Sequence, residues 1–143
     1  MASMTQAESE TFLAGSHVAV IGLEQPGRPP LLTPIWYHYA PGGVIGLWMD
    51  GESYKVKRLR KTSRLSLCVQ DERRPYRYVS VAGDIASIGP IDFERDLVPL
   101  VARYLEGEER SRYLADLGGP EGVVGDVYVT VTPRHWRGED LSR

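Results

Sequence analysis

Basic residues crowd one short stretch of the sequence. Six of them lie within positions 55–64, and no acidic residue lies between Tyr54 and Gln70, although the whole chain carries a net charge of −2. On a helix, the cations at 57, 60, 61 and 64 would share one face. Ser53 would cap this helix, and its opening turn leaves backbone N–H groups free to bind an anion. The stretch predicts a phosphate site, with an ordinary solvated surface as the alternative; its cations are Lys55, Lys57, Arg58, Arg60, Lys61 and Arg64.

A second stretch, Thr33–Tyr39, is rich in aromatic residues and contains Pro34. A proline inside a strand removes a hydrogen-bond donor from the ladder, so it marks a sheet edge or a bulge, where neighbouring backbone groups can meet a ligand. The side chains of Trp36 and Tyr39 could wall a flat ring system. Alternation along the strand also predicts that half of these aromatics belong to the core, and for Trp36 the core interpretation is favoured.

Other residues give weaker signals. Arg77 lies between two tyrosines and would either grip an anionic group of a ligand or cover a strand end. The histidines at 17, 38 and 135 show no metal-ligand spacing, so no metal site is predicted. The common motifs of serine hydrolases and nucleotide-binding proteins are not found in the sequence. Cys68, the single cysteine, cannot form an internal disulfide and is interpreted as a small buried filler in a strand.

The elements that position these residues are mostly strands. Period-two and apolar runs predict six strands, and the hairpin spacing of the early ones favours antiparallel pairing. A bend or bulge is expected near Gly83, and Pro99 predicts a kink or early break in its helix. The expectation is a mainly β protein, a small closed or nearly closed β-barrel with peripheral helices. The predicted strands are 17–24, 31–40, 44–49, 64–70, 76–88 and 123–132, and the predicted helices are 5–14, 53–61, 92–105 and 109–117.

Length and composition limit the class of protein. A chain of 143 residues with 42% hydrophobic and 25% charged residues predicts a single globular domain spanning residues 1–143. The near-neutral charge argues against a nucleic-acid partner, and no apolar run is long enough to span a membrane. No secretion signal is visible at the N-terminus, so a cytoplasmic location is expected. Arginine outnumbers lysine 14 to 3, a bias typical of GC-rich bacterial genomes, here interpreted as actinobacterial.

Two blocks of the sequence resemble a known family. The first is Gly27-Arg28-Pro29 through Thr33-Pro34-Ile35-Trp36, and the second, Ser53–Leu67, is similar to the pattern Ser-x-Lys-x-Arg-Asn-Leu-Arg-x-x-Pro-Arg-Val-Ser-Leu. Both resemble the pyridoxamine 5′-phosphate oxidase-like proteins, which have a six-stranded antiparallel split β-barrel that binds FMN or related cofactors. The sequence departs from this pattern at Lys57 (Arg in the pattern) and Ser63 (Pro). A further stretch, Tyr76-Arg77-Tyr78-Val79 with Ala82-Gly83, resembles the next strand of the family, and there Ala82 replaces the Glu of a Glu-Gly pair. In its length and sequence motifs, the chain is most similar to the flavin/deazaflavin oxidoreductase B group.

The resemblance implies where a cofactor would bind. Members are homodimers that hold the cofactor in a groove between subunits. By this resemblance Ser53, Lys55 and Lys57 would bind the cofactor phosphate, and Thr33, Pro34, Ile35 and Trp36 would line the ring, largely through backbone groups. Arg77 and Tyr78 would lie on the substrate side, and Trp136 with Arg137 would reach across from the partner subunit. The C-terminal arginine-rich motif of pyridoxamine phosphate oxidase itself is missing, so vitamin B6 chemistry is not expected.

Three functions follow as hypotheses. The first is a reductase that uses the 8-hydroxy-5-deazaflavin coenzyme (coenzyme F-420) to exchange a hydride with a flat unsaturated small molecule, with either Tyr78 or water as the proton donor. The cluster of cations suits the long anionic tail of this coenzyme. The second is an FMN-binding oxidoreductase on the same fold, ranked lower because one terminal phosphate needs fewer cations. The third is a non-catalytic barrel that carries or sequesters a ligand.

Overall fold

The computed structural model describes residues 2–143, and most of them form one antiparallel sheet. Its strands are β1 (Ala2–Ser3), β2 (Ala19–Gln25), β3 (Arg28–Ile35), β4 (Tyr37–His38), β5 (Ile45–Asp50), β6 (Arg64–Asp71), β7 (Arg77–Pro90) and β8 (Asp126–Asp140). The helices are α1 (Gln6–Leu13), α2 (Tyr54–Thr62), a π-helical turn (Phe93–Leu97) that leads into α3 (Val98–Val101), α4 (Gly107–Asp116) and α5 (Gly119–Gly122).

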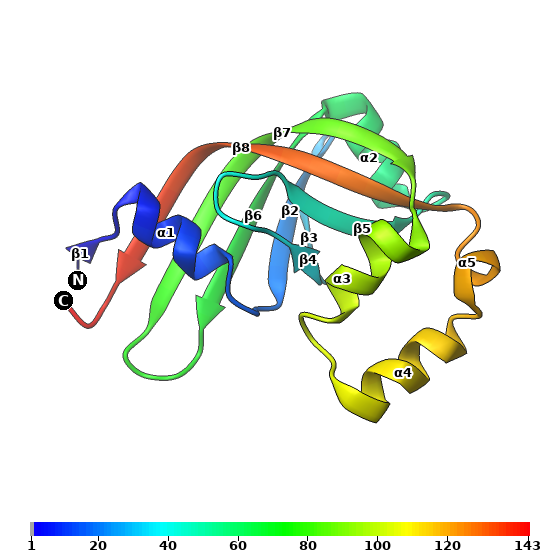
Figure 1. The fold of residues 1–143 in the computed structure, drawn as a ribbon. Coiled ribbons are helices and arrows are strands. Elements are labelled where there is room, and N and C mark those ends of the chain that lie inside the picture. The colour runs from blue at the N-terminus through cyan, green and yellow to red at the C-terminus, as the bar shows by residue number, and fades with distance from the viewer. Residues whose placement is uncertain (1) are drawn as a thin grey trace.

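The sheet curls almost into a closed barrel. Its strand order is β3-β2-β6-β7-β8-β5-β4, with β1 added to β8. The two ends of this order, β3 and β4, are consecutive in the chain and are separated only by Trp36. One stretch of chain therefore pairs with β2 in its first half and with β5 in its second, and this brings the ends of the sheet together (Figure 1).

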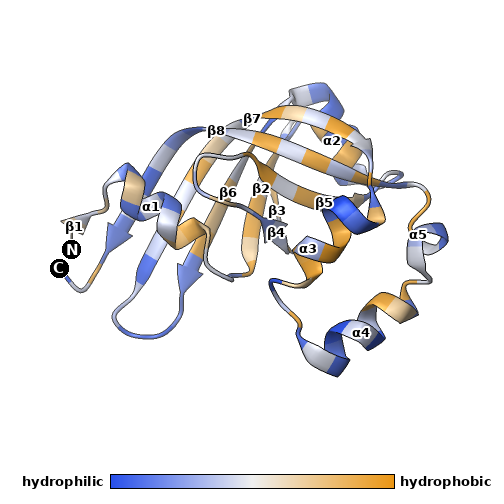
Figure 2. Ribbon diagram, in the orientation of Figure 1, coloured by the Kyte–Doolittle hydropathy of each residue, from blue (hydrophilic) through white to orange (hydrophobic). Residues whose placement is uncertain are grey.

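Alternating side chains fill the barrel. On β6, Leu65, Leu67 and Val69 are buried, whereas Ser66, Cys68 and Gln70 face outward, as the period of a strand requires. Figure 2 shows the same alternation of apolar and polar residues along β7 and β8. Helix α2 covers one end of the barrel with Val56 and Leu59, which are fully buried. The contiguous apolar interior is the main source of stability.

A second, smaller core lies outside the barrel, under the segment that connects β7 to β8. Leu97, Val101 and Val123 are buried there, and partly buried aromatics pack around them, among them Trp36 and Trp48. The indole N–H of Trp48 donates to the Asp126 carboxylate over 2.8 Å. This core fixes α3 and α4 to the part of the sheet where β3 gives way to β4 (Figure 1).

The predicted fold class is confirmed, with corrections at several boundaries. The six long strands exist, the pairing is antiparallel, and the register of β7 shifts between Ala82 and Gly83, where a bulge was expected. The predicted strand 31–40 is wrong as a single element because it breaks at Trp36, and the turn before it is shorter than predicted. The last strand begins and ends later than 123–132, because it keeps pairing with the long β7.

The helical predictions are also confirmed in part, with one helix divided. Asp92 caps its helix as expected, accepting from the Arg95 N–H over 2.8 Å. The predicted helix 92–105 is divided into a π-helical turn and a short α-helix, whose first turn contains Pro99. None of the helices in residues 2–143 combines the length and apolar composition that crossing a bilayer would require.

Candidate functional site

Helix α2 is built as the sequence predicts. The Ser53 hydroxyl accepts a hydrogen bond from the Val56 N–H over 3.4 Å, and this caps the helix. The helix ends at Thr62 because Ser63 adopts a left-handed conformation, with φ of 59°. Arg64 therefore belongs to strand β6, and the expected four-cation helix face is reduced to Lys57, Arg60 and Lys61.

Most of the cations of α2 have no acidic partner. The ion pairs of residues 2–143 include Arg64 with Glu24, but none of them involves Lys55, Lys57, Arg60 or Lys61. Arg58 instead donates through Nε to the Glu24 carbonyl over 3.1 Å. A group of unpaired cations on one short helix repels itself, so a bound anion would stabilise it.

The opening turn of α2 fits a phosphate group. Among the described residues, the backbone N–H groups of Tyr54 and Lys55 donate to no protein acceptor. The Ser53 oxygen accepts from Val56, which leaves its own proton free to donate. A hydroxyl, two N–H groups and the half-buried Lys55 form the donor set that phosphate oxygens require.

Strand β3 presents an open edge of the sheet. It stands at the end of the strand order and pairs only with β2, with Thr33 opposite Ile21 and Pro34 opposite Val20. The edge position of Pro34 confirms the sequence prediction. In the described structure β5 is paired with β8 and, briefly, with β4, but not with β3, so the split of the barrel lies between β3 and β5. Because α2 follows directly after β5, the phosphate donors lie at the end of this split.

The aromatic side chains near the split are used for packing. Trp36 stacks on Tyr104, with ring centroids 4.6 Å apart and planes at 7°, which confirms the core interpretation of this residue. Tyr39 is only 2% exposed, and its hydroxyl donates to Glu10 over 2.7 Å. Burial, and then this hydrogen bond, raise the pKa of Tyr39 to about 12. The prediction that Trp36 and Tyr39 wall a ring is wrong for Tyr39; the backbone of residues 33–36 is what remains accessible along the edge.

Arg77 and Tyr78 lie at the other end of the sheet. Arg77 pairs with Asp71, at 3.4 Å, and its guanidinium lies 5.0 Å from the centre of the Phe12 ring. Arg64 and Asp71 are seven positions apart along β6, so Arg77, which stands opposite Asp71, is roughly 23 Å from the start of β6. Tyr78 is half-buried opposite Gln70 and Glu139. Within one chain, neither residue joins the donors of α2.

Trp136 and Arg137 are also placed apart from α2. Trp136 packs against the barrel core of its own chain, 6.0 Å from the Tyr39 ring in a tilted arrangement. Arg137 is exposed and lies 4.0 Å from the Glu139 carboxylate. The indole of Trp136 therefore packs against its own barrel, whereas the exposed Arg137 side chain is accessible to another molecule.

Cys68 corrects another expectation. Its side chain faces outward and is exposed, because it alternates with the buried Leu67 and Val69. It lines a cavity of about 580 Å³ that also touches Pro34 of β3, with apolar walls from Val18 and Val20. Ser16, His17, Gln70, Asp71, Glu72 and Arg73 complete the lining of this cavity. It thus adjoins the open edge of β3 from the outer side of the sheet.

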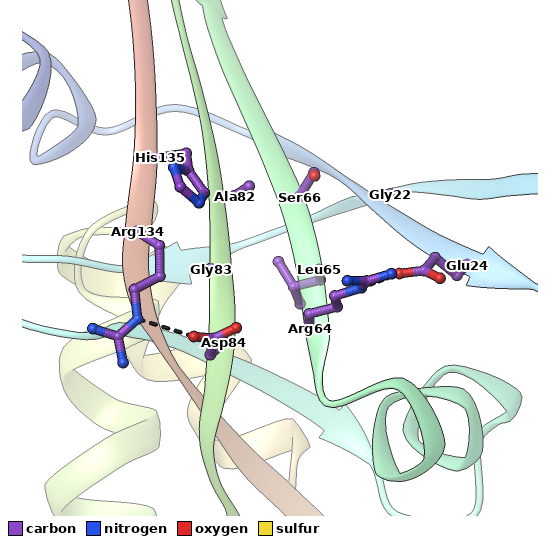
Figure 3. Close-up of a pocket in the computed structure, with 10 residues that line it drawn as sticks. All are labelled: Gly22, Glu24, Arg64, Leu65, Ser66, Ala82, Gly83, Asp84, Arg134 and His135. Atoms are coloured by element: carbon purple, nitrogen blue, oxygen red, sulfur yellow. Dashed lines mark hydrogen bonds and ion pairs between the residues drawn. The ribbon is translucent and has the colours of Figure 1, made fainter.

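Another cavity, of about 530 Å³, lies on the outer face of the sheet across β2, β6, β7 and β8. Its floor consists of small residues, and Gly22, Ser66 and Ala82 stand opposite one another in neighbouring strands. Figure 3 shows an ion pair on each side, Arg64 with Glu24 and Arg134 with Asp84. Because both arginines already pair with carboxylates, this cavity is a weaker candidate for binding a phosphate than the unpaired cations of α2.

Two residues that hold the split in place were missed in the sequence. Arg103 donates to the carbonyls of Ala14, Gly15 and Tyr39, at 2.8–3.2 Å. Tyr104 donates to the His17 carbonyl over 2.7 Å and accepts from the Tyr37 N–H over 3.0 Å. All of these partners are more than 60 positions away, so no local pattern indicates them.

Comparison with known proteins identifies the fold. No protein-family model matches the sequence, and no curated protein matches it. Among solved structures, an F-420 reductase superposes with a TM-score of 0.71 at 20% identity, covering 89% of this chain and 94% of the other. A conserved hypothetical protein of Mycobacterium tuberculosis superposes with a TM-score of 0.75 at 25% identity, covering 96% and 86%. General stress protein 26 of Bacillus anthracis gives 0.64 at 17% identity, covering 93% and 92%.

These similarities define the class of structure. The chain has the split-barrel fold of the pyridoxamine 5′-phosphate oxidase-like proteins, a fold that it also shares with a pyridoxamine 5′-phosphate oxidase-like protein of Listeria innocua at a TM-score of 0.63. The fold predicted from the sequence resemblance is therefore confirmed. At these identities the comparisons concern the fold, and the activity is argued from the residues of the site.

Proposed function

We propose that this protein is an oxidoreductase that binds the 8-hydroxy-5-deazaflavin coenzyme and exchanges a hydride with a flat unsaturated small molecule. The observation that carries the proposal is the opening turn of α2. There, free N–H groups, the Ser53 hydroxyl and the unpaired Lys55 and Lys57 lie at the end of a split whose edge is the open strand β3. An F-420 reductase among the proteins of this fold supports the same chemistry.

The residues of the chain would bind and orient the coenzyme. Ser53, Lys55 and Lys57 hold its phosphate, and the open edge of Thr33–Trp36 holds the ring through backbone groups. When bound, the coenzyme supplies the hydride chemistry, so no nucleophilic side chain is needed. The remaining cations of α2, Arg60 and Lys61, extend the positive surface along the helix toward the anionic tail.

FMN is the second candidate for the same site. A FAD-binding protein of Mesorhizobium loti shares the fold, with a TM-score of 0.64 at 15% identity. A single terminal phosphate would use Ser53 and Lys55 and leave the cations farther along α2 without a partner. For this reason we rank FMN below the deazaflavin coenzyme. A barrel that only carries a ligand, without catalysis, is the third candidate.

We further propose that two copies of the chain form the working site. The outer face of β2 and β3 exposes apolar side chains, including Leu32 at 68%, Val18 at 55% and Val20 at 40%. Covering such residues favours association. A second subunit could also bring Arg77, Tyr78 and Arg137 to the split, since these residues lie away from α2 in their own chain. Tyr78 remains the candidate proton donor to the substrate in such a dimer.

A side-by-side titration tests the proposal. The purified protein is titrated with the deazaflavin coenzyme and with FMN, and binding is followed by the fluorescence of the ring. Micromolar or tighter binding of the deazaflavin coenzyme with weak binding of FMN is expected. Tight binding of FMN with weak binding of the deazaflavin coenzyme would instead support an FMN-binding oxidoreductase. Binding of neither cofactor would contradict the proposed activity and leave only the fold.

A further inference from the structure

Tyr104 completes the backbone hydrogen bonds where the barrel strand breaks. At Trp36 the chain stops pairing with β2 and begins to pair with β5, so the ladder of backbone hydrogen bonds is interrupted there. The Tyr37 N–H donates instead to the Tyr104 hydroxyl, over 3.0 Å, and this hydroxyl donates to the His17 carbonyl over 2.7 Å. The Tyr104 side chain, from the turn that follows α3, thereby links β4 to the segment that enters β2.

The ring of Tyr104 fixes the last residue of the open edge. It stacks in parallel on the indole of Trp36, with centroids 4.6 Å apart and planes at 7°. Tyr113 of α4 lies against the same indole at 5.7 Å and 40°, a looser and tilted contact. Stacked aromatic pairs restrict rotation of both rings. The position of Trp36, and of the backbone that bears it, therefore depends on Tyr104.

The neighbouring Arg103 keeps this arrangement rigid. Its guanidinium lies 4.9 Å from the centre of the Tyr37 ring. It donates to the carbonyls of Ala14 and Gly15, before β2, and to the carbonyl of Tyr39, just after β4. Breaking such a network would leave buried donors without partners, which destabilises the local arrangement. Residues 103 and 104 together link the segment that enters β2 to the chain just after the break.

From this geometry we infer that Tyr104 is a positioning residue for the cofactor ring. It acts through Trp36 and the Tyr37 N–H, which set the direction in which the backbone of Thr33–Trp36 leaves β2. The inference rests on the proposed function, in which this edge holds the ring. It predicts that the Tyr104 hydroxyl affects binding of the ring and leaves binding of the phosphate to α2 unchanged.

The experiment compares Tyr104→Phe with Tyr113→Phe. Tyr104→Phe keeps the stack on Trp36 and removes only the hydroxyl, and Tyr113→Phe removes a hydroxyl from the other ring on the same indole. Each variant is titrated with whichever cofactor the wild-type protein binds. Inorganic phosphate is then used as a competitor without a ring. Urea unfolding, run in the titration buffer and at the titration temperature, checks that both variants are fully folded there.

We expect Tyr104→Phe to weaken cofactor binding about tenfold and to change the inhibition constant of inorganic phosphate by less than about twofold. Tyr113→Phe should change neither quantity. Equal weakening of cofactor and phosphate would mean a general structural role and would overturn the inference, as would unchanged cofactor binding. If the wild-type protein binds neither cofactor, the proposed function fails, and the inference fails with it.

Discussion

Ile35 and Tyr37 are two residues apart in the chain, yet they pair with strands on opposite sides of the split. Ile35 stands opposite Ala19 of β2, and Tyr37 stands opposite Leu47 of β5. The residue between them, Trp36, packs into the second core instead of continuing the ladder. The split is thus closed at one end by the chain itself and remains open along β3, where the backbone of residues 33–35 can meet a ligand.

The first prediction concerns the phosphate donors. Replacing Lys55 and Lys57 together by Ala should weaken cofactor binding by about a hundredfold or more, because two charge-assisted hydrogen bonds are lost. Arg60→Ala with Lys61→Ala removes the same charge from the other end of α2 and should weaken binding far less. Titration by ring fluorescence measures both. Similar losses in the two double variants would show that α2 attracts the cofactor only through its total charge.

The second prediction concerns the bulge in β7. A Cβ atom at Gly83 would lie 2.5 Å from the Thr132 carbonyl oxygen, which belongs to the backbone and cannot rotate away. Gly83→Ala should therefore lower the free energy of unfolding by about 1–3 kcal/mol. Gly89→Ala is the control on the same strand, since a Cβ there meets nothing within 4 Å. Urea unfolding followed by tryptophan fluorescence compares them, and equal stability of the two variants would contradict the prediction.

The third prediction concerns the end of α2. Ser63 has φ of 59°, and its N–H donates to the Leu59 carbonyl over 2.9 Å. Ser63→Gly should raise the free energy of unfolding by about 0.5–1 kcal/mol, because glycine adopts this conformation without strain. Ser63→Pro should lower it by about 3 kcal/mol, because proline cannot reach a positive φ and has no N–H. A stable Ser63→Pro variant would mean that the helix can end differently here.

The structure also accounts for one departure from the family pattern. At position 63, proteins of the family that this sequence resembles commonly carry proline, whereas this chain has a serine in a left-handed conformation. The turn from α2 into β6 therefore differs locally from the one that a proline would impose. The strand that follows still places Leu65 and Leu67 in the core.

The fourth prediction concerns pH. Burial lowers the pKa of His17 and of His38 from the ordinary value of 6.5, and the charge of Arg103 lowers both further. At His17 the hydrogen bond to the Phe12 carbonyl, and then the charge of Asp71, oppose this lowering without reversing it. Below pH 6.5 the unfolded chain binds more protons than the folded protein, so the free energy of unfolding must fall as the pH falls. The loss should begin near pH 6.5, above the range in which carboxylates titrate.

Urea unfolding at pH 7, 6 and 5 measures this loss. Replacing both histidines by Gln should flatten the dependence, because the titrating groups are gone. Gln at position 17 can still donate to the Phe12 carbonyl, which His17 Nε2 meets at 3.0 Å. His135→Gln, on the exposed surface, is the control and should leave the slope unchanged. An unchanged slope in the double variant would assign the acid sensitivity to other groups.

The barrel could be predicted because its strands carry a local signal. Leu65, Leu67 and Val69 alternate with polar residues in the sequence, and the same three are buried in the structure. The break at Trp36 carries no such signal, since the alternation of Thr33–Tyr39 continues through it. The strand breaks where the chain changes its pairing partner from β2 to β5, and the Tyr37 N–H at that point donates to Tyr104, which lies in the distant turn after α3.

The candidate site shows the same difference between local features, which the sequence reveals, and long-range contacts, which it does not. The Ser53 cap and the cations of α2 are local features, so the sequence located them correctly. The position of Arg77 depends on the full length of the β6–β7 pairing and on Phe12 from α1, which no local pattern encodes. The extension of β8 over Pro133–Asp140 was missed for a related reason. These residues are mostly polar, and their strand conformation comes from pairing with β7.

The pairing of β1 with the end of β8 has a practical consequence for engineering. Ala2 stands opposite Asp140 and Ser3 opposite Glu139, so the beginning and the end of the chain lie side by side (Figure 1). They lie at the Arg77 end of the sheet, on the far side from α2. A short linker could join them, and new ends could then be cut in the exposed loop 72–76, giving a circular permutant with its helix α2 undisturbed. Within one chain, an affinity tag on either end would likewise lie away from the phosphate donors of α2.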